Sequence, residues 1–236
     1  MKNLTKGAIG VSTILTLGTV ATAEITGAYT YNYSVTAADF DGSDVTVNVQ
    51  NLYLSSNDAA DTVLNVYNVN LASSAQVPYF QSFTGTGWQP TNLGGPFDTP
   101  ALRFADSFVT IGGFEQNTLI PEQSPGAGSG TGLDPNFGGN NAPCPADSAG
   151  WYNGSPPSLN GQVGQVAAPD GGFKLGVFIG RFTLNGDFTL VGSSLETTWN
   201  QGLGTPGVQA GFIVTPAPGA LALFGLAAFG RHRRRD

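Results

Sequence analysis

The sequence predicts an all-β protein, an antiparallel β-sandwich of jelly-roll-like type with a long Gly/Pro-rich insertion. Three observations predict it. Several stretches alternate apolar and polar residues with a period of two, the pattern of half-buried strands. Clusters of Gly, Asn and Asp separate these stretches and favour turns. Outside the two ends of the chain, no window of helical length shows a good 3.6-residue period.

The expected strands follow one another along the chain. Each is a run rich in Val, Thr, Tyr or Phe, residue types that are enriched in strands. They cover residues 29–35, 45–54, 63–71, 107–111 and 208–214. They define a single domain between residues 24 and 214.

A further hairpin is expected at residues 181–190, RFTLNGDFTL. Asn185-Gly186 is the preferred dipeptide of a type I′ turn, because both central residues take positive φ angles. In this register Phe182 faces Thr189, so each face of the hairpin carries apolar side chains. We therefore expect the hairpin inside a sheet that is covered on both sides.

Residues 112–172 interrupt the strand pattern. They are rich in Gly, Pro, Asn and Ser and show no clear strands. Such long loops inside a compact domain are usually functional or mobile. We expect an insertion that lies over the sandwich and is pinned there by Trp151.

The first 23 residues have the pattern of a secretory signal peptide. Two lysines precede an uncharged, mostly apolar segment at residues 8–20. Ala21 and Ala23 form a small-x-small cleavage site, so the mature chain is expected to begin at Glu24. The alternative is an uncleaved membrane anchor, which the apolar segment is too short to favour, since a span needs about 20 residues.

The tail, residues 215–236, ends in an apolar run and a basic cluster. Residues 219–230, GALALFGLAAFG, would form a helix about 18 Å long, against a hydrocarbon core of about 30 Å. The basic cluster is Arg231, Arg233, Arg234 and Arg235. It would stay on the cytoplasmic side of a membrane. The pattern indicates a temporary anchor for a membrane-embedded processing enzyme; the alternative is a terminal helix packed on the domain.

This tail resembles the PEP-CTERM sorting signal of exopolysaccharide-producing bacteria, in which Pro-Glu-Pro precedes an apolar helix and arginines. Pro216 and Pro218 match the two prolines, and Ala217 stands in place of the glutamate. The resemblance covers about the last 22 residues. It implies recognition by exosortase, a membrane protease-transpeptidase, and release or anchoring at the surface of a Gram-negative-type cell.

Charge and histidine usage exclude several functions for the domain. Between Glu24 and Thr215 there are fifteen acidic and three basic residues, a net charge of −12. Such a surface repels phosphate backbones, which argues against nucleic-acid binding. The single histidine, His232, lies in the tail. Ser-His-Asp and Cys-His catalysis and His-rich metal sites are therefore excluded from the domain.

Cys144 is the only cysteine, so an intrachain disulfide is excluded. In an exported protein a lone thiol can serve intermolecular pairing or modification. We favour an unpaired loop cysteine without a role, since no cationic residue near it in the sequence would activate it.

Asp39, Asp41 and Asp44 form the densest carboxylate cluster. Carboxylate oxygens at this spacing are candidate calcium ligands, although the EF-hand pattern is not met. The same residues also make Asx-turns between strands, the interpretation that we favour. Calcium is the single candidate cofactor.

Four aromatic residues lie near Gly, Asn or Pro: Trp88, Trp151, Tyr152 and Trp199. If exposed, their flat rings suit stacking on carbohydrate. We favour the alternative that they are core or loop-pinning residues, since large aromatic side chains are more often buried.

The functional expectation is an exported, non-catalytic bacterial cell-surface or extracellular-matrix protein that is associated with exopolysaccharide. Its partners would be signal peptidase, an exosortase-like enzyme and polysaccharide, with transient membrane contact through the tail. The alternative is a secreted polysaccharide-active enzyme with a carboxylate pair. Glu115, Glu122 and Glu196 are available for one but lie in no recognised motif. A third option is a protein that an unprocessed tail retains in the membrane.

Overall fold

The computed structural model describes residues 24–85, 87–90, 97–112, 130–154, 160–168 and 172–216. The expected signal peptide with Ala21 and Ala23, and the tail beyond Pro216, lie outside these residues, and so do the terminal helices expected there. Within the described ranges, no helix has both the length and the apolar character needed to cross a bilayer.

Strands make up most of the regular structure. In chain order they are β1 (Ile25–Ala38), β2 (Asp44–Ser56), β3 (Thr62–Asn70), β4 (Phe108–Val109), β5 (Thr131–Leu133), β6 (Ala149–Asn153), β7 (Gly164–Ala167), β8 (Phe173–Leu184), β9 (Ser194–Asn200) and β10 (Val208–Thr215). The helices are short: η1 (Ser73–Ala75), α1 (Pro100–Phe104) and η3 (Pro135–Phe137). The all-β expectation is confirmed.

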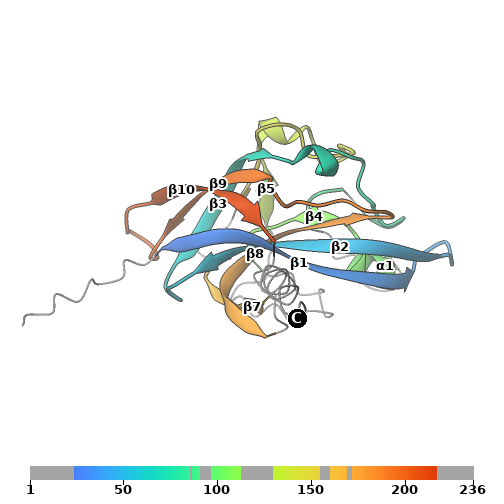
Figure 1. The fold of residues 1–236 in the computed structure, drawn as a ribbon, viewed down its shortest axis with the longest axis horizontal. Coiled ribbons are helices and arrows are strands. Elements are labelled where there is room, and N and C mark those ends of the chain that lie inside the picture. Colours follow the sequence, from blue (N-terminus) through green and yellow to red (C-terminus); the bar gives the residue numbers. More distant parts are fainter. Residues whose placement is uncertain are drawn as a thin grey trace, which may run out of the picture.

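The ten strands form one curled sheet. Its order is β4-β8-β2-β1-β10-β9-β3-β6-β5, and β7 also pairs with β8. Figure 1 shows the long β1–β2 pair crossing the molecule, with β3, β9 and β10 continuing the sheet at one end. The expectation of a purely antiparallel sheet is wrong at one pair, because β1 and β10 run parallel with Ala28 opposite Val214. These strands are the first and the last of the domain, so no tight turn imposes an antiparallel orientation on them.

The expected strands at residues 29–35, 45–54, 63–71 and 208–214 are confirmed as β1, β2, β3 and β10. The β1–β2 pairing runs continuously from Ala38 opposite Asp44 to Gly27 opposite Ser55. The turn between them includes Gly42 at φ 82°, a conformation that glycine adopts without steric cost. The run at residues 107–111 gives only the two-residue strand β4.

The main hydrophobic core lies between the two halves of the curled sheet. It combines residues of β1, β2 and β8 with residues of β3, β6 and β9. Trp88 packs against Phe137 and Phe182, with both ring-centroid distances at 5.6 Å. A smaller core on the other face of β1, β2 and β8 includes Tyr29 and Tyr53, whose rings are stacked 5.3 Å apart.

The hairpin expected at residues 181–190 does not form. Residues 187–190 are not a strand, and β8 pairs instead with β2, β4 and β7. Asn185 is not among the described non-glycine residues with positive φ, so the type I′ turn is absent. The physical reason is Gln50 of β2. Its Oε1 accepts the backbone N–H of Leu190 (2.9 Å), and its Nε2 donates to the Phe188 carbonyl (2.7 Å).

The insertion at residues 112–172 contains regular structure that its sequence pattern did not predict. Strands β5 and β6 extend the sheet beyond β3, and β7 pairs with β8. Each has only three to five residues, so alternation alone does not reveal it. Trp151 is buried in β6 and its Nε1–H donates to the Thr110 carbonyl (2.9 Å), so it holds this segment to the domain as expected.

Candidate functional site

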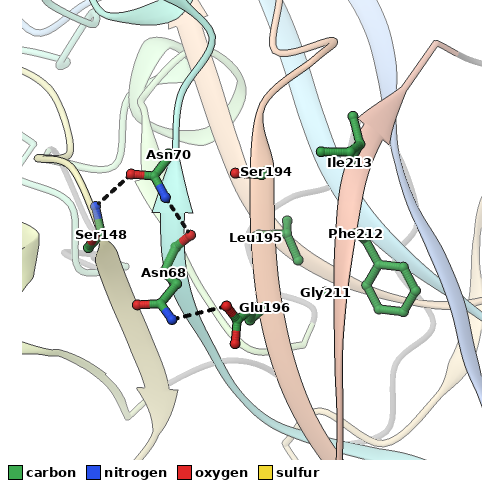
Figure 2. A pocket seen from close by; sticks show the side chains of 9 residues that line it. All are labelled: Asn68, Asn70, Ser148, Ser194, Leu195, Glu196, Gly211, Phe212 and Ile213. Carbon is green, nitrogen blue, oxygen red and sulfur yellow. Dashed lines mark hydrogen bonds between the residues drawn. The ribbon is translucent and has the colours of Figure 1, made fainter.

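A shallow hollow of about 520 Å³ lies over the strands β6, β3, β9 and β10 (Figure 2). It is lined by Asn68, Asn70, Ser148, Ser194, Leu195, Glu196, Gly211, Phe212 and Ile213. Its volume falls in the range of small-molecule sites, about 300–1,000 Å³. It is open to solvent, so a ligand could extend beyond it.

The strand register sets which side chains border the hollow. Glu196 of β9 lies opposite Tyr67 of β3 on one side and opposite Gly211 of β10 on the other. Because Gly211 has no side chain, the surface beside Glu196 is left open. Two residues further along β10, on the same face of the sheet, Ile213 lies opposite Ser194 and is 59% exposed.

An irregularity in β3 brings Asn68 to this hollow. The register of β3 with β9 shifts between Tyr67 and Asn70, and Asn68 has a φ of 49°. Bulges of this kind redirect a side chain relative to the regular pleat. Here the Asn68 side chain reaches Glu196, and its Nδ2 donates to Oε1 of the carboxylate (3.1 Å).

Ser148, the residue directly before β6 in the chain, lines the hollow on the side away from β10. Its backbone N–H donates to Oδ1 of Asn70 (3.2 Å), and the Asn70 Nδ2 donates to the Asn68 carbonyl (3.0 Å). Figure 2 shows the resulting chain of hydrogen bonds from Ser148 to Glu196. Asn68 and Ser148 are the two non-glycine residues with positive φ in the described part of the chain, and both line this hollow. Unfavourable backbone conformations of this type are concentrated at functional sites.

The chemistry of the hollow combines hydrogen-bonding and apolar groups. Loss of solvent contact raises the pKa of the Tyr67 phenol, and the neighbouring Glu196 carboxylate raises it further. Tyr67 is not among the residues that line the hollow, so its phenol acts on Glu196 and not directly on a ligand. Glu196 supplies acceptor oxygens, Ser194 a hydroxyl, and Ile213 an exposed apolar side chain. This set suits a ligand with several hydroxyl groups and apolar C–H surfaces.

The basic residues of the domain are all engaged elsewhere. Arg103 pairs with Asp98, and Lys174 lies 4.1 Å from the centre of the Tyr29 ring. Arg181 is fully buried. None of them lines the hollow, where Glu196 is the single charged residue among those described.

A second hollow, of about 310 Å³, lies over β1 and β2. Two of its amide side chains, Asn48 and Gln50, bind the chain itself. Asn48 donates from Nδ2 to the Gly186 carbonyl (2.9 Å), and Gln50 is committed to residues 188 and 190. This hollow is the smaller of the two.

Two of the three aspartates proposed for calcium, Asp39 and Asp41, bind the loops around them. Asp39 accepts the hydroxyl of Ser82 (2.8 Å) and the backbone N–H of Phe83 (2.9 Å). Asp41 accepts the backbone N–H of Ser43 (2.9 Å), which confirms the Asx-turn, and Asp44 begins β2. The described ranges hold no group of three or more His, Cys, Asp or Glu side chains placed to bind a metal ion. A calcium site at these aspartates stays a prediction.

The four candidate aromatics separate into two classes. Trp88, Trp151 and Trp199 are buried core residues, as the favoured interpretation predicted, so they cannot stack on a surface sugar. Tyr152 is 46% exposed, and its ring covers Gly132 of β5. Of the four, Tyr152 is thus the one whose ring a sugar could reach.

The lone thiol of Cys144 is half-buried and packs against the main core. Its Sγ lies 3.4 Å from the Pro145 carbonyl oxygen. Burial raises the pKa of the thiol, which makes the reactive thiolate less available. The absence of a chemical role for Cys144 stays a prediction.

Two buried charged residues were missed in the sequence. Asp106 accepts the backbone N–H of Ser82 (2.7 Å), and burial raises its pKa to about 8. Arg181 donates to the Arg103 carbonyl (2.7 Å) and to Oδ1 of Asn51 (3.2 Å), while its Nη2 has no hydrogen-bond partner among the described residues. Asp106 links two loop segments, and Arg181 of β8 holds α1 to the sheet. No local sequence pattern reveals these roles.

Comparisons with protein-family models, with curated proteins and with solved structures find no match. The carboxylates Glu115 and Glu122 and the sorting-motif residues beyond Pro216 lie outside the described residues.

Proposed function

We propose that this chain is an exported, non-catalytic protein of the bacterial cell surface or extracellular matrix that associates with exopolysaccharide. Export would use the signal peptide, and an exosortase-like enzyme would process the Pro-Ala-Pro tail. The tail would make the transient membrane contact.

One observation carries the proposal. Strand β1 begins at Ile25, directly after the expected signal-peptidase site, and β10 ends at Thr215, directly before the Pro216 motif. Removal of both address segments would leave every strand of the sheet intact. The two halves of the curled sheet face each other across the main core, and we interpret them as the layers of the expected jelly-roll-like sandwich.

The alternative function, a polysaccharide-active enzyme, needs a second carboxyl group about 5–9.5 Å from the first. Glu196 is the single carboxylate among the described residues that line the hollow. The lining thus favours binding over hydrolysis.

The intact mass of the protein recovered from the surface and medium of the producing cells tests this proposal. We expect the mass of a chain from Glu24 to about Pro218. A recovered chain that still carries residues 231–236 would contradict processing of the tail. Carbonate extraction of the membranes would then show whether the unprocessed tail anchors the protein, since an anchored chain resists extraction.

A further inference from the structure

We propose that the hollow between β6, β3, β9 and β10 binds a neutral sugar unit of a polysaccharide chain. The inference rests on the proposed function for its biological setting, because it specifies which class of polysaccharide the protein contacts and where. It concerns binding only and involves no chemical step.

The shape of the hollow suits one segment of a polymer. Its volume of about 520 Å³ accommodates a small ligand, and it opens onto the outer face of the sheet. Gly211 provides the opening, because a side chain at this position would project beside Glu196. A Cβ atom there would lie 3.5 Å from the Cγ atom of Glu196, so a larger side chain would occupy the space that we assign to the sugar.

The polar groups suit a polyol. The Glu196 carboxylate can accept hydrogen bonds from neighbouring hydroxyl groups, and hydrogen bonds to a charged acceptor are stronger than those to a neutral one. Asn68 fixes this carboxylate through the 3.1 Å hydrogen bond. Ile213 offers apolar surface to the C–H groups of a sugar ring.

Charge selects neutral sugars over acidic ones. Glu196 would repel the carboxylate of a uronic acid residue at close range. No basic side chain borders the hollow in the described chain to compensate, since Arg103, Lys174 and Arg181 are engaged elsewhere. The net charge of −12 between Glu24 and Thr215 opposes polyuronates further.

Titration of the protein, as recovered from producing cells, with oligosaccharides tests the inference. The probes are glucan, mannan and galactan oligomers as neutral ligands, and polyuronate oligomers as acidic ones. We expect saturable binding of at least one neutral oligomer and none of the polyuronates. The signals of the Asn68 side-chain amide should shift in NMR spectra when the neutral ligand is added.

Two variants and a control locate the site. Gly211→Leu fills the hollow without removing a hydrogen bond, and we expect at least a tenfold loss of affinity. Glu196→Gln removes the charge but keeps an acceptor oxygen, and we expect a loss of about tenfold. Gln209→Leu places the same side chain two residues away on the same face of β10, and its affinity should stay within about twofold of the wild type. Circular dichroism verifies that each variant is folded.

The inference is overturned if the wild type binds no neutral oligomer, if it prefers polyuronates, or if Gly211→Leu binds as well as Gln209→Leu. These results are distinct from a failure of the proposed function. A protein that reaches the cell surface but binds no neutral sugar overturns the inference alone. A protein that binds the sugar but is never exported overturns the proposed function alone.

Discussion

The side-chain amide of Asn68 donates a 3.1 Å hydrogen bond to the carboxylate of Glu196, 128 positions further along the chain. The bond depends on the irregular register of β3, which places Asn68 at a φ of 49°. The position of the Glu196 carboxylate in the hollow therefore depends on a backbone conformation of Asn68 that most residue types avoid.

The backbone at position 68 can be tested by substitution. Asn68→Gly and Asn68→Ala both remove the side-chain amide, but only glycine adopts this φ without steric cost. We expect the alanine variant to be less stable than the glycine variant by about 1 kcal/mol, measured by urea unfolding. Equal stability of the two variants would mean that β3 relaxes to a regular strand when Asn68 is lost.

The contribution of Asp106 to the stability of the protein should fall as pH rises from about 4 to about 8. Burial raises its folded-state pKa to about 8, and the nearby Asp39 adds to the increase while Arg181 opposes it. Over this interval the folded state holds a proton that the unfolded state has lost, so raising the pH favours unfolding. Asp106→Asn keeps an acceptor for the Ser82 N–H and removes the titration.

We expect the unfolding free energy to depend less on pH in Asp106→Asn than in the wild type. The difference in unfolding free energy between pH about 4 and about 8 should change by several kcal/mol at most. Urea titrations at a series of pH values measure this quantity. The control is Asp187→Asn, which removes an exposed carboxyl and should leave the dependence in place. An Asp106→Asn profile parallel to the wild type would contradict the assignment.

The side chain of Gln50 should be essential for holding residues 188–190 against β2. Gln50→Ala would leave the Leu190 N–H and the Phe188 carbonyl without their partner, at a cost of about 2–3 kcal/mol. Amide hydrogen exchange at Leu190 should accelerate in the same variant. Gln50→Glu keeps the acceptor for Leu190 and loses the donor to Phe188, so its exchange rate at Leu190 should rise less. Unchanged exchange in Gln50→Ala would show that other contacts hold this segment.

Substitution of two phenylalanines by alanine should change stability to very different extents. Phe182 is buried against Tyr79 and Trp88, and Phe182→Ala should cost about 3–5 kcal/mol. Phe83 is 69% exposed and stacks on the exposed Phe40, so Phe83→Ala should change stability by about 0.5 kcal/mol or less. Thermal unfolding followed by tryptophan fluorescence compares the two. A large loss in Phe83→Ala would indicate that this residue is covered in solution.

Alternation and enrichment in β-forming residues were sufficient to predict the strands β1, β2, β3 and β10, because each is long enough for its composition to show. It failed at the Asn185-Gly186 turn, since the decisive contact comes from Gln50, which is remote in the sequence. It also missed β5, β6 and β7, because strands of three to five residues are defined by their partners rather than by their own pattern.

The hollow was not predicted, because Asn68, Ser148 and Glu196 come from three separate parts of the chain. One sequence signal pointed toward it. The buried residues Val63, Val66 and Val69 are spaced by three rather than two, which is incompatible with a regular strand and indicates bulges. The carboxylate partner of the bulge could not be found without the register of β3 with β9.

The parallel pairing of the first and last strands constrains the order of folding. Thr215 donates its side-chain hydroxyl to the carbonyl of Ala28 (3.1 Å) across 187 positions, a contact of very high sequence separation. β1 therefore gains its second neighbour only after the whole domain has been synthesised. A chain that ends before Val208 would leave β1 and β9 with exposed backbone edges, and such edges pair with one another in self-association.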